Sequence, residues 1–160
     1  MIKLKIILLL KLALQPQQVE SFLLSHGIKA RVKIVDLSQP LVLGNQLDYF
    51  YTLETAFRSK KSTYIHVFTD PFLDKESKEN MLGLAKSKTR FSHSVFNNEN
   101  SAGLARTIHS WVAFLHELGH SILKLKHTKN CVTVMDEAAM ACPNIAELTF
   151  TKQQSRIMKK

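Results

Sequence analysis

The sequence is poor in the residues that mark specialised classes of protein. Its 160 residues include two cysteines, Cys131 and Cys142, which are too few for the disulfide framework of a small secreted domain. These two residues are reduced thiols, one local disulfide or the remnants of a metal site. Only five glycines and four prolines are present, and the chain has no internal repeat and no low-complexity segment. Collagen-like and repeat architectures are therefore excluded.

Acidic residues are also scarce. The chain has 13 acidic and 22 basic residues, which gives a formal net charge of +9 with neutral histidines. Such a charge can favour nucleic acid or another anionic partner. However, most of the basic residues are lysines spread along the whole chain, and no arginine-rich run with interleaved aromatic residues is present. We therefore expect a solvated, lysine-rich surface and no nucleic-acid partner.

The sequence has no segment that is long and apolar enough to cross a bilayer. Residues 1–14 resemble a weak signal peptide, with a basic start and an apolar core, but Lys11 interrupts the core and no small-residue cleavage site follows. The apolar core is also far too short for a transmembrane helix. We expect a buried first strand here, in a cytoplasmic, monomeric protein without a transmembrane segment. Secretion is the alternative.

The apolar patterns along the chain predict an α/β domain. Hydrophobic residues make up 45% of the chain and charged residues 22%, which is typical of a globular protein that buries its own core. We expect strands at residues 5–10, 30–36, 63–69, 81–85 and 89–96, helices at 17–25, 46–57, 104–125 and 151–159, and loops at 37–44, 72–80 and 97–103. The first two strands flank a helix and should be parallel. The prediction is one domain, residues 1–160, with an upper α/β lobe (1–120) and a small irregular lower lobe (121–160).

One pentapeptide, His116-Glu117-Leu118-Gly119-His120, indicates the chemistry. It reads H-E-x-x-H within a stripe of apolar residues that recur every three or four positions, which predicts an amphipathic helix. Residues four apart lie on one face of a helix, so His116 and His120 can bind one zinc ion. Glu117 lies on the flank, where it can reach a water molecule on the zinc without binding the metal.

The motif supplies only two of the ligands that a catalytic zinc ion needs. Such a site usually has three protein ligands and one open position for water, so the third ligand must come from beyond the helix. His127 follows His120 by seven residues and is one candidate. The alternative is a carboxylate, as in the gluzincin pattern, and the candidates for that role are Asp136, Glu137 and Glu147.

The stretch from His116 to Met135 resembles the metzincin clan of zinc peptidases. In that clan H-E-x-x-H is followed by a third histidine and then by a methionine turn beneath the metal, and Met135 follows His127 by eight residues. Upstream segments, from the apolar first strand to residues 91–94, have counterparts in the same order in the archaemetzincins. The resemblance implies a compact zincin-like fold, one Zn²⁺ ion bound by His116, His120 and His127, and an apolar floor formed by Met135.

The end of the motif helix departs from the family pattern. In the clan's H-E-x-x-H-x-x-G-x-x-H sequence a glycine stands where this chain has Leu123, and one extra residue separates His120 from His127. Without glycine, a left-handed turn costs free energy at that position. We therefore expect the helix to run on through Leu125, with Lys126 making the turn.

A second departure concerns the number of metal sites. The archaemetzincins have an additional, cysteine-rich zinc site, and its first two cysteine positions correspond to Thr128 and Thr133 in this chain. Cys131 and Cys142 do not restore the spacing. We therefore expect one zinc ion rather than two.

The resemblance implies hydrolysis of peptide bonds in peptide or protein substrates. Zinc would polarise the scissile carbonyl and activate a water molecule, while Glu117 would act as general base and then protonate the leaving amine. By the same analogy, the strand at residues 90–96 would form the upper rim of the cleft and pair with an extended substrate. The alternatives are a gluzincin-like peptidase with a carboxylate ligand and a non-catalytic zinc-binding or partner-binding module.

The remaining candidate residues are less specific. His109 lies two turns before the motif and is either close to the site or purely structural. We expect His93 at the surface. Lys124, Lys126 and Lys129 surround the third ligand in sequence and either favour acidic substrates or are simply solvated.

Overall fold

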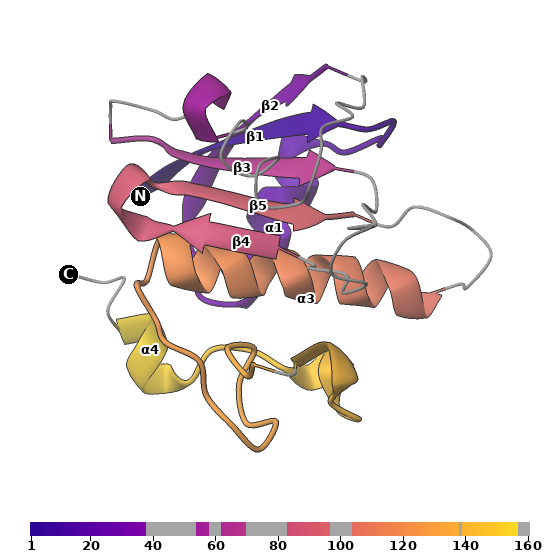
Figure 1. The fold of residues 1–160 in the computed structure, drawn as a ribbon, viewed down its shortest axis with the longest axis vertical. Helices are drawn as coiled ribbons and strands as arrows, with labels where there is room; N and C mark the ends of the chain where they lie inside the picture. The colour runs from indigo at the N-terminus through magenta and orange to yellow at the C-terminus, as the bar shows by residue number, and fades with distance from the viewer. Residues whose placement is uncertain (38–53, 58–61, 70–82, 97–103, 138, 157–160) are drawn as a thin grey trace.

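The computed structural model describes residues 1–37, 54–57, 62–69, 83–96, 104–137 and 139–156 (Figure 1). The loops expected at residues 72–80 and 97–103 lie outside these ranges, as does all but Leu37 of the loop expected at 37–44. Of the helix expected at residues 46–57, only residues 54–57 are described, and they are helical. Residues 81–82 of the strand expected at 81–85 and residues 157–159 of the helix expected at 151–159 also lie outside these ranges, and the remaining expected elements can be compared directly.

In the described ranges five strands form one mixed sheet, which confirms the predicted α/β class (Figure 1). The strands are β1 (Ile2–Leu9), β2 (Ala30–Asp36), β3 (Tyr64–Thr69), β4 (Gly83–Lys86) and β5 (Phe91–Val95). Their order across the sheet is β2-β1-β3-β5-β4. The pairs β1–β2, β1–β3 and β3–β5 are parallel, whereas β4 runs antiparallel to β5 and, among the described residues, forms an edge of the sheet.

The first parallel pair of strands follows from the local sequence. α1 (Pro16–Ser25) connects β1 to β2. Proline suits the first position of a helix, and the backbone N–H of Gln15 donates a hydrogen bond to Oε1 of Gln18 at 2.9 Å. Gly27 follows the helix with a φ of 83°, a conformation that only glycine adopts at no steric cost. The predicted helix start, the glycine stop and the parallel pairing are therefore confirmed.

The main hydrophobic core lies between the sheet and helices α1 and α3. α1 packs against β2, and α3 (Leu104–Ser121) packs against β5 and β4. Phe68 of β3 and Phe114 of α3 are fully buried, and their ring centroids lie 5.0 Å apart. A smaller apolar cluster contains Ile7, Leu9, Ile65, Val67 and Phe91. Since successive side chains of a strand alternate between its faces, this second cluster covers the other face of the sheet and explains the continuous apolar run of β1.

Two histidines are buried in the sheet, and the prediction for one of them was wrong. We expected His93 at the surface, but it is 2% exposed, because it lies two residues after Phe91 and so on the face of the sheet that carries the second apolar cluster. Nε2 of His93 lies 2.7 Å from Oγ1 of Thr69, and the ring of His66 lies between the hydroxyls of Ser92 and Ser94 at 2.7 and 2.8 Å. Burial lowers the pKa of His93 to about 4 and holds the pKa of His66 well below its usual value. Both rings are therefore neutral near pH 7.

The chain after α3 is largely irregular, as predicted, and lies on the side of α3 away from the sheet (Figure 1). It contains two short 3-10 turns, η3 (Ala139–Ala141) and η4 (Ile145–Glu147), followed by the short helix α4 (Lys152–Arg156). A disulfide joins Cys131 to Cys142. Oγ1 of Thr128 lies 2.8 Å from Oγ1 of Thr133, so a hydrogen bond joins the two positions that correspond to cysteines in the archaemetzincin pattern.

None of the helices in these ranges combines the length and the apolar character that crossing a membrane would require.

Candidate metal centre

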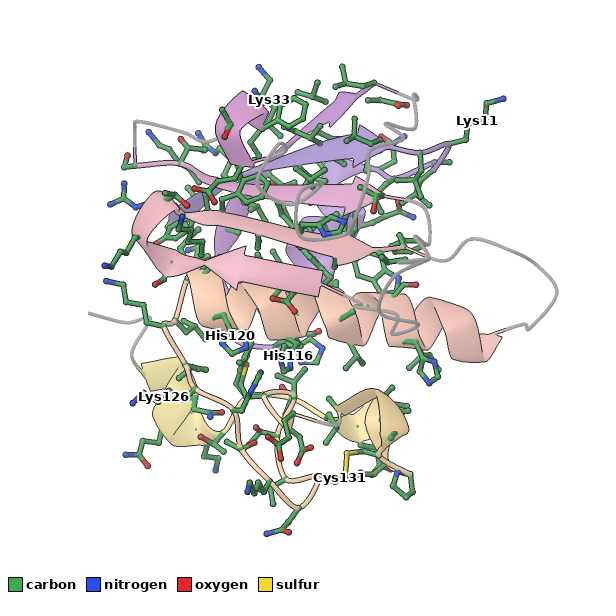
Figure 2. The ribbon with its side chains drawn as sticks, in the orientation of Figure 1. Lys11, Lys33, His116, His120, Lys126 and Cys131 are labelled. Carbon is green, nitrogen blue, oxygen red and sulfur yellow. A yellow bond between two sulfur atoms is a disulfide. The ribbon has the colours of Figure 1, made fainter. Side chains whose placement is uncertain are left out.

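The two histidines of the H-E-x-x-H motif lie one turn apart on α3 and face the C-terminal segment (Figure 2). Phe114 packs against Phe68 of the sheet and so fixes the rotation of the helix about its axis. Residues two and six positions after Phe114 point to the opposite side, which places His116 and His120 there. Their Nε2 atoms are 3.1 Å apart. The pairing of two imidazoles on one helix face is therefore as predicted.

The helix ends earlier than the sequence predicts. We expected it to run on through Leu125 with Lys126 making the turn, but α3 ends at Ser121. Lys124 instead adopts a left-handed conformation with a φ of 55°, and the backbone N–H of Leu125 donates to the carbonyl of Gly119 at 3.0 Å. This turn reverses the chain and accommodates the one residue by which the His120–His127 spacing exceeds that of the clan pattern. The residue with positive φ is Lys124 rather than a glycine.

The reversed chain brings His127 to the two motif histidines. Its Nε2 lies 3.2 Å from Nε2 of His116 and 3.0 Å from Nε2 of His120. A tetrahedral zinc site with Zn–N bonds of about 2.0–2.1 Å would separate the nitrogens by roughly 3.3–3.4 Å. The three nitrogens therefore form a triangle of nearly the size that one zinc ion requires, and the three residues form a group able to hold a metal ion.

The orientation of two of these rings is fixed by backbone carbonyls. Nδ1 of His116 donates to the carbonyl of Val134 at 2.8 Å, and Nδ1 of His120 donates to the carbonyl of Leu125 at 2.7 Å. Burial lowers the pKa of His116 to about 4 and also lowers the pKa of His120, so both rings are neutral. A neutral ring that donates from Nδ1 presents a lone pair at Nε2. These two lone pairs converge on one point, an arrangement that a cation stabilises.

Glu117 lies beside the histidines and faces an open cavity. The cavity has a volume of about 360 Å³. Its lining consists of Ala85, Ser87, Glu117, His120, Lys124, Leu125 and His127. Glu117 is 8% exposed, and burial raises the pKa of its carboxyl group to about 8. A cation at the histidines would favour the carboxylate form and lower this pKa.

Met135 packs beneath the motif. Its side chain is fully buried, and a Cβ atom on Gly119 would overlap its Sδ atom and would also meet the ring of Phe150 at 3.0 Å. The backbone N–H of Thr128 donates to the carbonyl of Met135 at 2.9 Å, which holds the turn in place. The glycine that the site requires is therefore the one inside the motif, where the methionine approaches the helix backbone.

The carboxylates that we considered as alternative ligands do not join the histidines in the structure. Asp136 is buried, and its Oδ2 accepts a hydrogen bond from the backbone N–H of Cys131 at 2.8 Å. Glu137 and Glu147 are exposed. The group of candidate ligands around His127 contains no carboxylate among the described residues.

The strand beside the cavity differs from the one that we expected. We predicted that residues 90–96 form the upper rim of the cleft, but β5 is internal, and the residues that line the cavity from this side are Ala85 of β4 and Ser87. No local pattern signals this difference, because only the pairing order of the strands decides which strand lies beside the cavity. The carbonyls of Val134 and Leu125 were missed for a similar reason, because backbone groups carry no side-chain signature.

Comparisons with known proteins agree with this geometry. No family model matches the chain, and no curated protein matches it. Among solved structures, the archaemetzincin of Methanopyrus kandleri has a TM-score of 0.68 at 12% identity, and the match covers 99% of this chain and 93% of that one. The archaemetzincin of Archaeoglobus fulgidus, solved with malonate, has a TM-score of 0.67 at 15% identity, covering 98% and 99%. A zinc-dependent peptidase from Methanocorpusculum labreanum has a TM-score of 0.62 at 14% identity, covering 97% and 99%. The chain therefore has the archaemetzincin fold over nearly its whole length.

Proposed function

We propose that this protein is a zinc-dependent peptidase with His116, His120 and His127 as metal ligands and Glu117 as general base. The observation that carries the proposal is the triangle of three Nε2 atoms, 3.0–3.2 Å apart, beside a glutamate that faces an open cavity. The fold supports it, since the similar structures include one described as a zinc-dependent peptidase.

The chain's own residues supply the parts that peptide hydrolysis needs. His116, His120 and His127 would hold the zinc ion, which when bound would supply Lewis-acid chemistry for the scissile carbonyl and for water. The Glu117 carboxylate accepts a proton from the attacking water and then delivers it to the nitrogen of the leaving amine as the C–N bond breaks. Val134 and Leu125 hold two imidazoles in the tautomer that leaves Nε2 unprotonated.

The edge strand next to the cavity offers a place for an extended substrate. β4 pairs on one side with β5, and within the part of the chain that the structure describes no strand pairs with its other side. An extended peptide can add to such an edge through main-chain hydrogen bonds. Ala85 belongs to β4 and lines the cavity together with Glu117. Pairing at β4 would therefore bring a peptide bond toward the general base.

The proposal is tested by replacing Glu117 with its neutral isostere. Purified Glu117→Gln protein should bind one equivalent of zinc, measured by mass spectrometry of the metal, while its hydrolysis of fluorescein-labelled casein falls by about 10²- to 10⁴-fold. The exposed glutamate Glu137 provides the control, because Glu137→Gln should retain full turnover. A chelator should abolish the wild-type activity.

Two results would contradict the proposal in different ways. Zinc binding by the wild type without any hydrolysis would indicate a non-catalytic zinc-binding module. Full turnover of the Glu117→Gln variant would show that another group takes the proton.

The disulfide bears on the expected location in the cell. We predicted a cytoplasmic monomer, and both parts remain predictions. Disulfides persist mainly in oxidising compartments, so the Cys131–Cys142 bond favours secretion, the alternative that we had left open. Alkylation of thiols in freshly lysed source cells tests this. Two modified cysteines per chain would support the cytoplasm, and none would support an oxidising compartment.

A further inference from the structure

The turn between the second and third histidines carries a lysine where the backbone favours glycine. Four described residues other than glycine have a positive φ, namely Arg90, Lys124, Asn130 and Cys131. Of these, only Lys124 lines the cavity. A left-handed conformation strains every residue with a Cβ atom, and such strain often lies at functional sites. The side chain of Lys124 is therefore a candidate for a role that glycine could not fill.

A second observation concerns the charges around the cavity. Lys124 is exposed and forms no ion pair with another described residue. The one acidic residue in the lining is Glu117, which is buried and has its task in proton transfer under the proposed function. The ammonium group thus lacks a counterion on the described part of the protein. A carboxylate on a bound substrate would provide one.

The position of the lysine sets where this carboxylate lies on the substrate. Lys124 stands between His120 and His127 in sequence, and all three residues line the same cavity. Ala85 and Ser87 line it from the β4 side. A peptide held between these two sides has its scissile bond at the histidines, so the group that meets Lys124 is close to that bond.

We propose that Lys124 is a specificity-determining residue that selects peptides with a carboxylate close to the scissile bond. This inference rests on the proposed peptidase function. The carboxylate comes from one of two sources, an aspartate or glutamate side chain or the free C-terminus of a peptide. The first source makes the enzyme an endopeptidase selective for acidic residues, and the second makes it an exopeptidase acting near C-termini.

Matched peptides distinguish the two sources. The probes are fluorogenic octapeptides in which one Asp or Glu is moved through successive positions, each compared with its Asn or Gln counterpart and with free or amidated C-termini. The wild type should cleave the preferred carboxylate form with a kcat/KM roughly fivefold to tenfold above that of the amide form. This ratio should fall as salt is raised, because exposed charges are screened.

Three variants isolate the charge from the backbone. Lys124→Asn removes the ammonium group and suits the left-handed conformation, so it should abolish the selectivity while retaining cleavage of the neutral peptide. Lys124→Arg should retain the selectivity. Lys126 is the matched control, since it is exposed, lies two residues away and does not line the cavity, so Lys126→Asn should behave as the wild type.

A binding measurement keeps this inference separate from the proposed chemistry. In the Glu117→Gln background, fluorescence anisotropy of the same labelled peptides should show a fivefold to tenfold preference for the carboxylate form, which Lys124→Asn removes. Lys124→Asn should also raise the melting temperature, because Asn relieves the backbone strain.

Unchanged selectivity or an equal loss for charged and neutral peptides would overturn the role of Lys124. Absence of hydrolysis with retained carboxylate preference in binding would overturn only the peptidase function.

Discussion

The Sδ atom of Met135 occupies the space that a Cβ atom on Gly119 would need. This contact joins the segment around Met135 to the helix between the two motif histidines. His116 adds a second connection, since its Nδ1 donates to the carbonyl of Val134, the residue before Met135. The segment around Met135 therefore packs against the helix and also orients the ring of His116, one of the candidate metal ligands.

Replacing Gly119 with alanine tests the close contact. In an ordinary helix this change adds up to about 1 kcal/mol of stability. Here we expect it to lower the free energy of unfolding by about 1–3 kcal/mol, because the added methyl group overlaps Met135. Urea denaturation measures the change. In the Gly119→Ala, Met135→Ala double variant the loss should be smaller than the sum of the two single losses. Additive losses would mean that the two side chains do not compete for space.

Removing His127 should remove the metal site. We expect His127→Ala to lower the affinity for Zn²⁺ by at least about 100-fold, because one of three converging nitrogens is lost. Competition with a chromophoric chelator measures the affinity. Glu147→Ala serves as the control, since Glu147 is exposed and lies outside the histidine group. Full zinc affinity in the histidine variant would refute the assignment, and loss of affinity in the glutamate variant would favour a carboxylate ligand.

The disulfide should stabilise the segment that carries Met135. Cys131 and Cys142 are separated by 11 residues and enclose Met135. Closing a loop of this size removes chain entropy worth roughly 2–3 kcal/mol from the unfolded state. We therefore expect the Cys131→Ser, Cys142→Ser double variant to lose about that much in the free energy of unfolding. Adding a reductant should destabilise the wild type by a similar amount and leave the double variant unchanged. A wild type insensitive to reductant would contradict this.

Acid should destabilise the protein through its buried histidines. The folded-state pKa of His93 is about 4, below the ordinary value of 6.5. Between these two values the unfolded chain binds a proton that the folded chain does not, so stability is complete above pH 6.5 and falls toward pH 4. His66 adds to the effect in the same direction, since burial also lowers its pKa.

A substitution of His93 isolates its share of this acid sensitivity. The slope of the free energy of unfolding against pH should be smaller in His93→Gln than in the wild type by up to about 1.4 kcal/mol per pH unit between pH 4 and 6.5. Gln retains a polar partner for Thr69. Denaturant titrations at several pH values measure the slopes. Equal slopes in the two proteins would show that His93 is not a buried neutral histidine.

The sequence alone was sufficient for the elements that depend on local signals. The strand at residues 30–36 and the helix from Pro16 to the glycine stop at Gly27 match the structure because apolar alternation, proline and glycine act on nearby backbone. The histidines four apart on one helix face follow from helical geometry in the same way. The resemblance added the third histidine and the archaemetzincin fold, and the structure confirms the fold.

What only the tertiary structure decided depends on contacts between distant residues. The pairing of β4 outside β5 decides which strand lies beside the cavity, and no local pattern records this order. The burial of His93 depends on the second apolar cluster, whose residues come from three strands. The left-handed turn at Lys124 arises because the chain must return to the helix, which outweighs the preference for glycine. H-E-x-x-H thus predicted the chemistry that we propose for the site, whereas the return of His127 and the packing of Met135 against the helix depend on long-range contacts that a linear pattern does not encode.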